Sequence, residues 1–594
     1  MATTTCSVSG LEDLLGKAGL HTPVPEFPGA DIVHNPQDIF RVYLADTLQR
    51  LVDCDRLLPR SPPFACPIKD GIHLRVFSSP NTLSRLLLPY IHDRCASYGY
   101  DSSVGLADAA APDGPKKKVI VEFSSPNMEK EFLVSHLRST LVGSYVANIH
   151  ASMGWDVVKM NYLGDWGKQI GLLAAGWQRF GSEEEFAKQP LRHLLEVNHK
   201  IKELFEPEHE QVKAAKAEGK DASEIESKGL HAERDVFFKK MEDKDPEAIA
   251  LWQRFRDATV KDYTDSYARL GVTFDEYSGE SQVSAESVAE VEQALKEKGV
   301  YEEHDGSWMV DFSKHDAKGL STAVVRYRNG TTSYLLRDLA AVLDRYKAHK
   351  FDKMIYVVAM EQEMHFHRVT KCLELMGRGD LAERLQHVAV AKINGLPDQF
   401  KDAKLLSDYL DGCRTVMQTS IDEETEEPLF VDKTNKSVDL LGLSGLFIQD
   451  FTHKRTTPYA VDSKKMTSLV RDSGAAIQNC YTRLTSKLSE VPADVDYQTL
   501  DYASLEAEDY AELLRIMAQY PDIAQASFKT LEPSLIIIYL LRLVDQVMAT
   551  LDDDDEQDWS DKDETNKARM ALYENARQVF ENGLRVLGVS PYSS

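Results

Sequence analysis

The sequence predicts an α/β protein with a Rossmann-type core and a long helical region after it. The segment "KVIVEFSS" (118–125) is short and rich in β-branched residues, which is typical of a buried strand. A helix with apolar residues at every fourth position and a second strand, "WDVVKMNYL" (155–163), follow it and complete a βαβ unit. From about residue 400 the pattern is helical to the end.

The composition limits the class of protein. With 43% hydrophobic and 28% charged residues, the 594-residue chain has the profile of an ordinary globular protein of several domains. The seven cysteines form no Cys-x-x-Cys pair, so we expect no metal site and no disulfide framework, and a cytoplasmic location. The net charge of −26 argues against a general nucleic-acid coat, but it leaves room for one RNA on a local basic surface. We expect no membrane-spanning stretch, and "SLIIIYLLRLV" (534–544) reads as a buried helix.

Changes in composition divide the chain into three predicted parts. Residues 1–115 mix helical patterns with a proline-rich segment and end in a linker-like run of small residues. Residues 116–400 alternate strands and helices and contain two insertions, at about 175–260 and 281–330. Residues 401–594 are helical.

Several long stretches are similar to one family. They are "VEFSSPN" (121–127), "HLRST" (136–140), "MNYLGDWGKQ" (160–169), "YSGESQVS" (277–284), "NGTTSYLLRD" (329–338) and "FDKMIYV" (351–357). With these motifs in this order, the chain resembles a class I arginyl-tRNA synthetase over nearly its whole length. The resemblance implies a Rossmann-type class I catalytic domain with inserted subdomains and a C-terminal α-helical anticodon-binding bundle. It also implies a small N-terminal domain, here shortened, that contacts the tRNA elbow.

The resemblance also implies a pocket for arginine. A guanidinium presents five N–H donors in a planar fork, so its pocket needs carboxylates and other oxygen acceptors. The family's arginine-binding positions are similar to a set that this sequence keeps: Glu122, Asn127, Tyr334, Asp338 and Gln362. Tyr334 and Asp338 are four residues apart and share a helix face. Glu122 belongs at the carboxyl end of a parallel strand, where ligands of such sheets bind.

The ATP-binding positions differ from the family pattern. Where the family has His-x-Gly-His, this chain has Leu133 and Ser135 in place of the first His and the Gly, and only His136 remains. In the second ATP loop, "LPDQFKD", Phe400 stands where a lysine would meet the pyrophosphate. Lys401 is one position away and could compensate. Because one lost transition-state donor typically costs about 10²–10³ in rate, these changes predict that no arginyl-adenylate is made.

Retained arginine binding without ATP use leads to a functional expectation. Arginyl-tRNA carries an arginine ester that is already activated toward amines. We therefore expect an ATP-independent enzyme that takes arginyl-tRNA and a second aminoacyl-tRNA and forms an arginine-containing cyclic dipeptide, similar to the fungal arginine-containing cyclodipeptide synthases. No cofactor is expected in that case. The alternatives are an arginyl-tRNA synthetase with variant signatures, which would use ATP and Mg²⁺, and a non-catalytic arginine or tRNA binder. A monomer with no membrane partner is expected throughout.

Candidate catalytic residues follow from this expectation. His136 is a candidate general base, and Ser135 a candidate nucleophile because it stands where the nucleotide would approach. Ser139, three residues after His136, faces it better on a helix than its direct neighbour does. Three further residues are candidates for tRNA-end contacts, with a structural role as the alternative for the first two: Asp165, Lys168 and His365.

Overall fold

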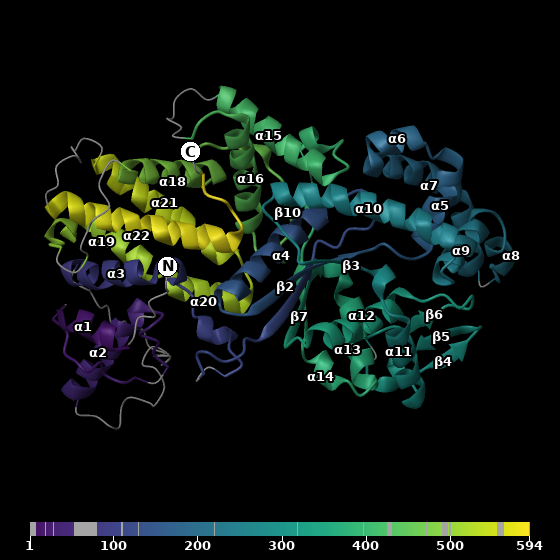
Figure 1. Cartoon of the computed structure of the whole chain (residues 1–594), viewed down its shortest axis with the longest axis horizontal. Helices are drawn as coiled ribbons and strands as arrows, with labels where there is room; N and C mark the ends of the chain where they lie inside the picture. The colour runs from purple at the N-terminus through teal and green to yellow at the C-terminus, as the bar shows by residue number, and fades with distance from the viewer. Residues whose placement is uncertain are drawn as a thin grey trace.

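The computed structural model describes residues 8–592 except 53–79, 424–430, 490–496, 498–499, 555–563 and the single positions 18, 28, 109, 110, 129, 133, 219, 318, 396 and 471. Its centre is a five-stranded sheet with the order β3-β2-β1-β7-β8 and parallel pairing throughout (Figure 1). The strands are β1 (Lys118–Phe123), β2 (Asp156–Leu163), β3 (Glu276–Gly279), β7 (Lys353–Ala359) and β8 (Leu385–Val390). This confirms the Rossmann-type α/β core.

Among the helices that pack on this sheet are α4 (Val134–Ser152), α12 (Tyr334–His349) and α13 (Glu363–Leu375). The predicted stripe of apolar residues on α4 is buried, and Leu137, Leu141 and Tyr145 are each at most 2% exposed. β1 ends two residues earlier than predicted. The reason is that Ser124 and Ser125 adopt left-handed backbone angles, with φ of 67° and 46°, which turn the chain away from the sheet.

Two insertions extend from the sheet at the end of the molecule opposite α1 and α2 (Figure 1). The first is helical and contains α5 (Lys168–Phe180), α6 (Glu183–Lys188), α7 (Pro190–Ala217), α8 (Ser223–Glu226), α9 (Gly229–Glu242) and α10 (Pro246–Arg269). The second consists of α11 (Ala285–Glu297) and an antiparallel sheet of β4 (Glu302–His304), β5 (Ser307–Val310) and β6 (Ala323–Arg326). A short helix, α14 (Gly379–Ala382), precedes β8.

The C-terminal region is a helical bundle. Its helices are α15 (Leu406–Glu423), α16 (Asn435–Phe451), α17 (Ser463–Met466), α18 (Gly474–Ser489), α19 (Glu508–Ala518), α20 (Tyr520–Thr530), α21 (Ser534–Asp554) and α22 (Glu564–Leu587). Contrary to expectation, residues 534–552 of α21 are long and apolar enough to cross a membrane by length and composition. Yet 56% of that stretch is buried, against α18, α19, α20 and α22, so α21 is the core helix of the bundle.

Arg138 joins α4 to the segment between the sheet and the bundle. Its side chain is fully buried, and its guanidinium donates to the carbonyls of Ala391, Thr457 and Lys454 at 2.9 to 3.1 Å. Its Nε lies 3.1 Å from Oδ1 of Asp450 on α16. In the same region β9 (Ile393–Gly395) pairs with β10 (Tyr459–Ala460). One buried side chain therefore holds three segments that lie far apart in the sequence.

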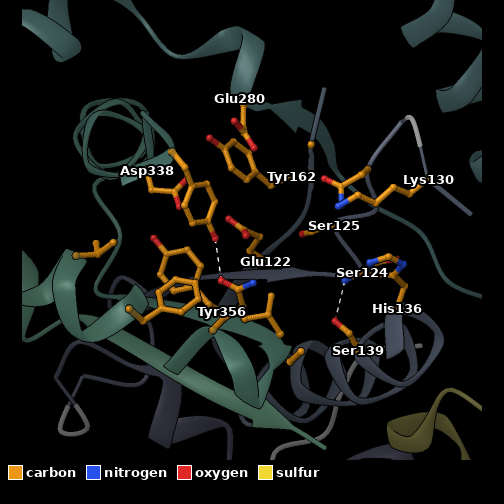
Figure 2. A pocket seen from close by; sticks show the side chains of 18 of the residues that line it. Glu122, Ser124, Ser125, Lys130, His136, Ser139, Tyr162, Glu280, Asp338 and Tyr356 are labelled. Atoms are coloured by element: carbon orange, nitrogen blue, oxygen red, sulfur yellow. Dashed lines mark hydrogen bonds between the residues drawn. The ribbon is translucent and has the colours of Figure 1, made fainter. Parts of the chain in front are cut away.

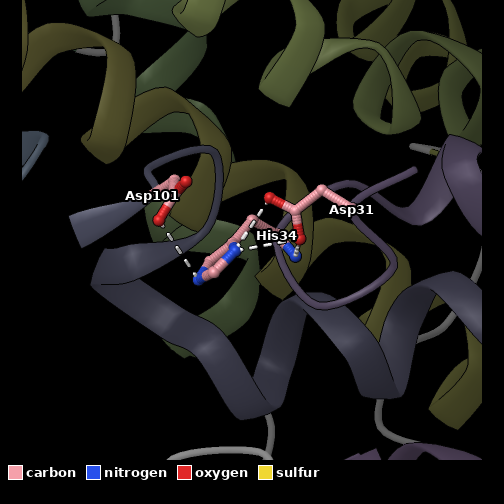
Figure 3. A group of neighbouring side chains, drawn as sticks. All are labelled: Asp31, His34 and Asp101. Atoms are coloured by element: carbon pink, nitrogen blue, oxygen red, sulfur yellow. Dashed lines mark hydrogen bonds and ion pairs between the residues drawn. The ribbon is translucent and has the colours of Figure 1, made fainter. Parts of the chain in front are cut away.

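The N-terminal helices α1 (Val8–Lys17), α2 (Pro36–Val52) and α3 (Pro80–Arg94) pack beside the bundle. The imidazole of His34 lies between two carboxylates (Figure 3). Its Nδ1 is 2.9 Å from Asp31, and its Nε2 is 3.7 Å from Asp101, in the connection to β1. Burial acts to raise the pKa of Asp31 and to lower that of His34, but the pairing outweighs it, so the pKa of Asp31 is lowered and that of His34 is raised. The exact boundaries of the three predicted domains stay predictions.

Candidate active site

A cavity of ≈ 360 Å³ opens at the carboxyl ends of the parallel strands (Figure 2). All five residues predicted to bind arginine line it: Glu122, Asn127, Tyr334, Asp338 and Gln362. Two of the predicted catalytic residues, His136 and Ser139, line it as well. The structure thus brings together side chains from β1, α4, α12 and the turn after β7. Whether each has its predicted role stays a prediction.

Three carboxylates dominate one end of the cavity, and Figure 2 shows them around a common space. Glu122 lies on β1, Glu280 directly follows β3, and Asp338 is on α12. Burial raises the pKa of Glu122 to about 7, although the nearby guanidinium of Arg345 opposes the rise. Burial likewise raises the pKa of Glu280 to about 7, against the opposing charge of Arg337. A cation entering this space would favour the ionised form of both groups.

Two of the three carboxylates already have a guanidinium partner from the protein. Nη1 of Arg345 lies 2.7 Å from Oε2 of Glu122, and Nε of Arg337 lies 2.6 Å from Oε2 of Glu280. Asp338 instead lies 2.6 Å from Nε2 of His365. Among the described residues, Asp338 is therefore the cavity carboxylate with no guanidinium of the protein against it. The three carboxylates thus have two guanidinium partners from the protein. A bound arginine would supply a third guanidinium.

The first turns of α12 position Asp338 and Tyr334. The hydroxyl of Ser333 caps the helix by accepting from Leu336 N at 3.2 Å. Tyr334 and Asp338, one turn apart, then face the same cavity. The ring of Tyr334 stacks on His365 with 4.0 Å between centroids, and its hydroxyl donates to Gln362 Oε1 at 2.9 Å. Burial and the nearby carboxylates raise the pKa of Tyr334, so it stays a phenol and a hydrogen-bond donor.

Asn127 is placed by a close approach of two backbones. It forms a parallel bridge with Gly164, which follows β2, and Met128 N donates to Gly164 O at 3.3 Å. A Cβ at position 164 would lie 2.0 Å from Oδ1 of Asn127. Any larger residue at Gly164 would therefore displace the amide of Asn127 from the cavity.

At the other end of the cavity are His136, Lys130 and Ser139 (Figure 2). Burial, with a smaller effect of Lys130, lowers the pKa of His136 to about 4, so its imidazole is neutral near pH 7. Ser139 Oγ donates to the carbonyl of Val357 and accepts from Ser124 N at 3.1 Å. Its proton is thus directed to β7 and not to His136, which gives Ser139 a structural contact. The side chain of Ser135 and the whole of Leu133 lie outside the part that the structure describes.

The second ATP loop has a different packing from that of a phosphate-binding loop. Phe400 is 3% exposed and packs against Leu137, Tyr409 and Gly412, so it fills the core beside α4. Lys401 is exposed and pairs with Asp398 of the same loop. Of the described residues that line the cavity, Lys130 is the one lysine, and neutral His136 is a second donor. These residues fit the phosphates of ATP only in part.

The three candidates for tRNA-end contacts lie outside the cavity. The Asp165 carboxylate is fully buried and accepts from Ser281 N, Ser281 Oγ and Arg256 Nε at 2.7 to 3.0 Å, so it is inaccessible to tRNA in this conformation. His365, 8% exposed, supports Asp338. Lys168 pairs with Asp235 of α9 at 2.9 Å and is partly exposed. A tRNA contact at Lys168 stays a prediction.

Sequence reasoning missed several cavity residues, namely Lys130, Tyr162, Glu280, Arg345 and Tyr356. Three of them had a signal. Tyr162, Glu280 and Tyr356 lie within motifs shared with the family, and Glu280 directly follows a strand, where ligand-binding residues of parallel sheets occur. Arg345 had none, because its contacts are made only in space. Its guanidinium lies 4.5 Å from the centroid of the Tyr162 ring, which is on β2, whereas Arg345 is on α12.

Comparisons with known proteins agree with this geometry. Residues 106–463 match the family described as tRNA synthetases class I (R), catalytic domain, and residues 477–594 match the DALR anticodon binding domain. The chain is 35% identical to a probable cytoplasmic arginine–tRNA ligase of Schizosaccharomyces pombe, over 98% of this chain and 99% of that one. It is 36% identical to the mitochondrial arginine–tRNA ligase of Saccharomyces cerevisiae, over 80% and 72% of the two chains. The arginyl-tRNA synthetase structure from Plasmodium falciparum has the same fold, with a TM-score of 0.63 and 18% identity over 81% and 78% of the chains.

These findings correct the functional expectation. The expectation of a cyclic-dipeptide synthase that uses a second aminoacyl-tRNA is wrong. The curated relatives, which match 98% and 80% of this chain, are named arginine–tRNA ligases. The names include both cytoplasmic and mitochondrial proteins, so the cytoplasmic location stays a prediction. With the catalytic and anticodon-binding domains both matched and one relative aligned along almost its full length, the chain belongs to the class I arginyl-tRNA synthetase family.

Proposed function

We propose that this protein joins arginine to a tRNA in an ATP-dependent ligation, with Mg²⁺ accompanying the nucleotide. The observation that carries the proposal is the cavity at the strand ends, which three carboxylates line, while only two of them pair with a guanidinium of the protein among the described residues. One further guanidinium completes the charge pairing. The family relationship supplies the reaction class, and the matched anticodon-binding domain supports tRNA as the partner.

The shape of the cavity orients the substrate. An arginine whose guanidinium lies between Asp338 and Glu280 directs its other end toward Lys130 and His136, which lie across the cavity (Figure 2). Lys130 contributes a positive charge there, and the neutral His136 ring contributes a hydrogen-bond donor for a phosphate oxygen. In the proposed ligation the arginine carboxylate attacks the α-phosphate of ATP and releases pyrophosphate. A tRNA ribose hydroxyl then takes the arginyl group and releases AMP.

The direct test is aminoacylation. The purified chain is incubated with labelled arginine, ATP, Mg²⁺ and unfractionated tRNA, and label precipitated with the tRNA is counted. Arginine-dependent exchange of pyrophosphate into ATP is measured in parallel. We expect both activities, and we expect citrulline, which has a neutral ureido group, to support neither.

A second candidate function is arginine or tRNA binding without catalysis. It is favoured by the burial of Phe400 and by the single lysine among the described cavity residues. Arginine binding without aminoacylation or pyrophosphate exchange would support this function. The variant Leu133→His/Ser135→Gly, which restores the family pattern, would then be expected to increase the exchange rate.

The raised carboxyl pKa values predict a pH dependence of arginine binding. Glu122 and Glu280, both with a pKa of about 7, are protonated below pH 6 and ionised above pH 8. Because a bound cation favours the ionised carboxylates, binding near pH 7 releases protons. The arginine affinity therefore rises from pH 6 to pH 8, by up to about tenfold for each group.

Calorimetry in buffers of different ionisation enthalpy measures this proton release directly. Arginine itself keeps its charge over this range, since the guanidinium does not titrate. An affinity that is flat between pH 6 and pH 8, with no buffer dependence of the binding enthalpy, would contradict the assignment of ionised carboxylates around the ligand.

A further inference from the structure

A chain of hydrogen bonds connects the helical insertion to the arginine cavity. Arg337, behind Glu280, donates through Nη1 to the carbonyl of Thr332 at 2.8 Å and to its hydroxyl at 3.1 Å. The hydroxyl of Thr332 in turn donates to Oε1 of Glu242 at 2.7 Å, and Thr332 N donates to the same oxygen at 3.3 Å. Glu242, the last residue of α9, thus lies three contacts from the cavity.

The position of Glu242 on its helix argues against a role in helix stability. The C-terminus of a helix carries partial negative charge and favours cations, so a carboxylate at the last residue is unfavourable there. Its contacts give a different reason for its presence. A hydroxyl that donates to a carboxylate becomes a better acceptor, so Glu242 strengthens the bond from Arg337 to Thr332.

The backbone around Glu280 has a separate anchor. Ser281 donates to the buried Asp165 through its N–H at 3.0 Å and its hydroxyl at 2.7 Å, and Asp165 also accepts from Arg256 of α10. The position of the turn after β3 is therefore independent of Glu242. Arg337 contacts Oε2 of Glu280 through both Nε and Nη2 and thereby orients the Glu280 carboxylate.

We propose that Glu242 is a positioning residue for arginine binding. It acts through Thr332 and Arg337 to orient the Glu280 carboxylate toward the substrate guanidinium, and it makes the helical insertion part of the amino-acid specificity of the site. This inference rests on the proposed function, because it assumes that arginine binds in the cavity.

The test measures arginine binding by calorimetric titration. It compares Thr332→Val with Thr332→Ser, and Glu242→Ala with Glu226→Ala. Thr332→Val removes the hydroxyl and keeps the shape of the side chain, and Glu242→Ala removes the acceptor. We expect each to weaken arginine binding by about 3- to 10-fold, which corresponds to the net contribution of one ordinary hydrogen bond. Thr332→Ser keeps the hydroxyl and is expected to restore the wild-type affinity.

The matched control is Glu226→Ala. Nη2 of Arg328 lies 2.6 Å from Oε2 of Glu226, so this pair also joins the helical insertion to the segment after β6, with no link to Arg337 in the described contacts. We expect this variant to bind arginine normally. A second readout is the ratio of the affinities for arginine and citrulline. This ratio falls if the orientation of Glu280 is lost, and it stays constant if the variant weakens the binding of both ligands equally.

Three outcomes would overturn the proposal. The first is normal arginine binding by both Thr332→Val and Glu242→Ala. The second is an equal loss of affinity in Glu226→Ala, and the third is an unchanged preference for arginine over citrulline in Thr332→Val and Glu242→Ala; either of these would indicate general loosening of the insertion. If the wild-type protein itself binds no arginine, the proposed function fails instead, so the two failures are distinguishable.

Discussion

Asp338→Asn is expected to weaken arginine binding by about 10²–10³-fold, the largest single effect at this site. The substitution keeps the shape of the side chain and removes the charge of the carboxylate that, among the described residues lining the cavity, has no guanidinium partner within the protein. A bound guanidinium would then lie in the cavity short of one ionised acceptor. Removing one partner of a buried ion pair costs about 3–5 kcal/mol, and the lower part of this range corresponds to this loss of affinity.

Asp344→Asn is the matched control for this prediction. Asp344 lies on the same helix, but its carboxylate accepts from Ser284 and Ser287 and does not line the cavity. Calorimetry should therefore show normal arginine binding for Asp344→Asn and none in the accessible range for Asp338→Asn. Binding of arginine by Asp338→Asn within about threefold of wild type, well under the 1.4 kcal/mol of a tenfold change, would place the guanidinium elsewhere.

Arg138→Met is expected to destabilise the junction between α4 and α16 by about 3–5 kcal/mol. The variant leaves the buried Asp450 without its cation and three backbone carbonyls without their donor. Because a chain of several domains does not unfold in one step, the appropriate measurement is hydrogen exchange of amides in α4 and α16. Their protection should fall by about 10²–10³-fold.

Two further variants make this result interpretable. Arg138→Met/Asp450→Asn removes both charges and is expected to be more stable than Arg138→Met, because no unpaired buried charge remains. Arg41→Met removes an arginine on α2 that pairs with Asp38 of the same helix and with Asp522 of α20, and it should change the protection of α4 and α16 little. Equal losses in the single and the double variant would show that Asp450 is not the partner that matters.

The departures from the family pattern at three predicted ATP-binding positions, Leu133, Ser135 and Phe400, led to a wrong conclusion about the reaction. Leu133 and Ser135 indicate that one half of the cavity departs from the family pattern. They do not indicate which reaction takes place there, because the residues of the other half are compatible with any enzyme that binds arginine. The family assignment rests instead on similarity along almost the whole chain, to which every domain contributes.

The sequence alone determined the α/β core, the helical C-terminal region and five residues that line one cavity, namely those predicted to bind arginine. Strand and helix periodicity is local, and Glu122, Asn127, Tyr334 and Asp338 lie in motifs that stay recognisable without their neighbours in space. The tertiary structure alone decided the partners of these residues. Ser139 bonds Val357 and not His136, and Arg345 neutralises Glu122. Glu242 reaches Glu280 through Thr332 and Arg337. Each of these contacts joins residues from different elements, so no spacing in the sequence encodes it.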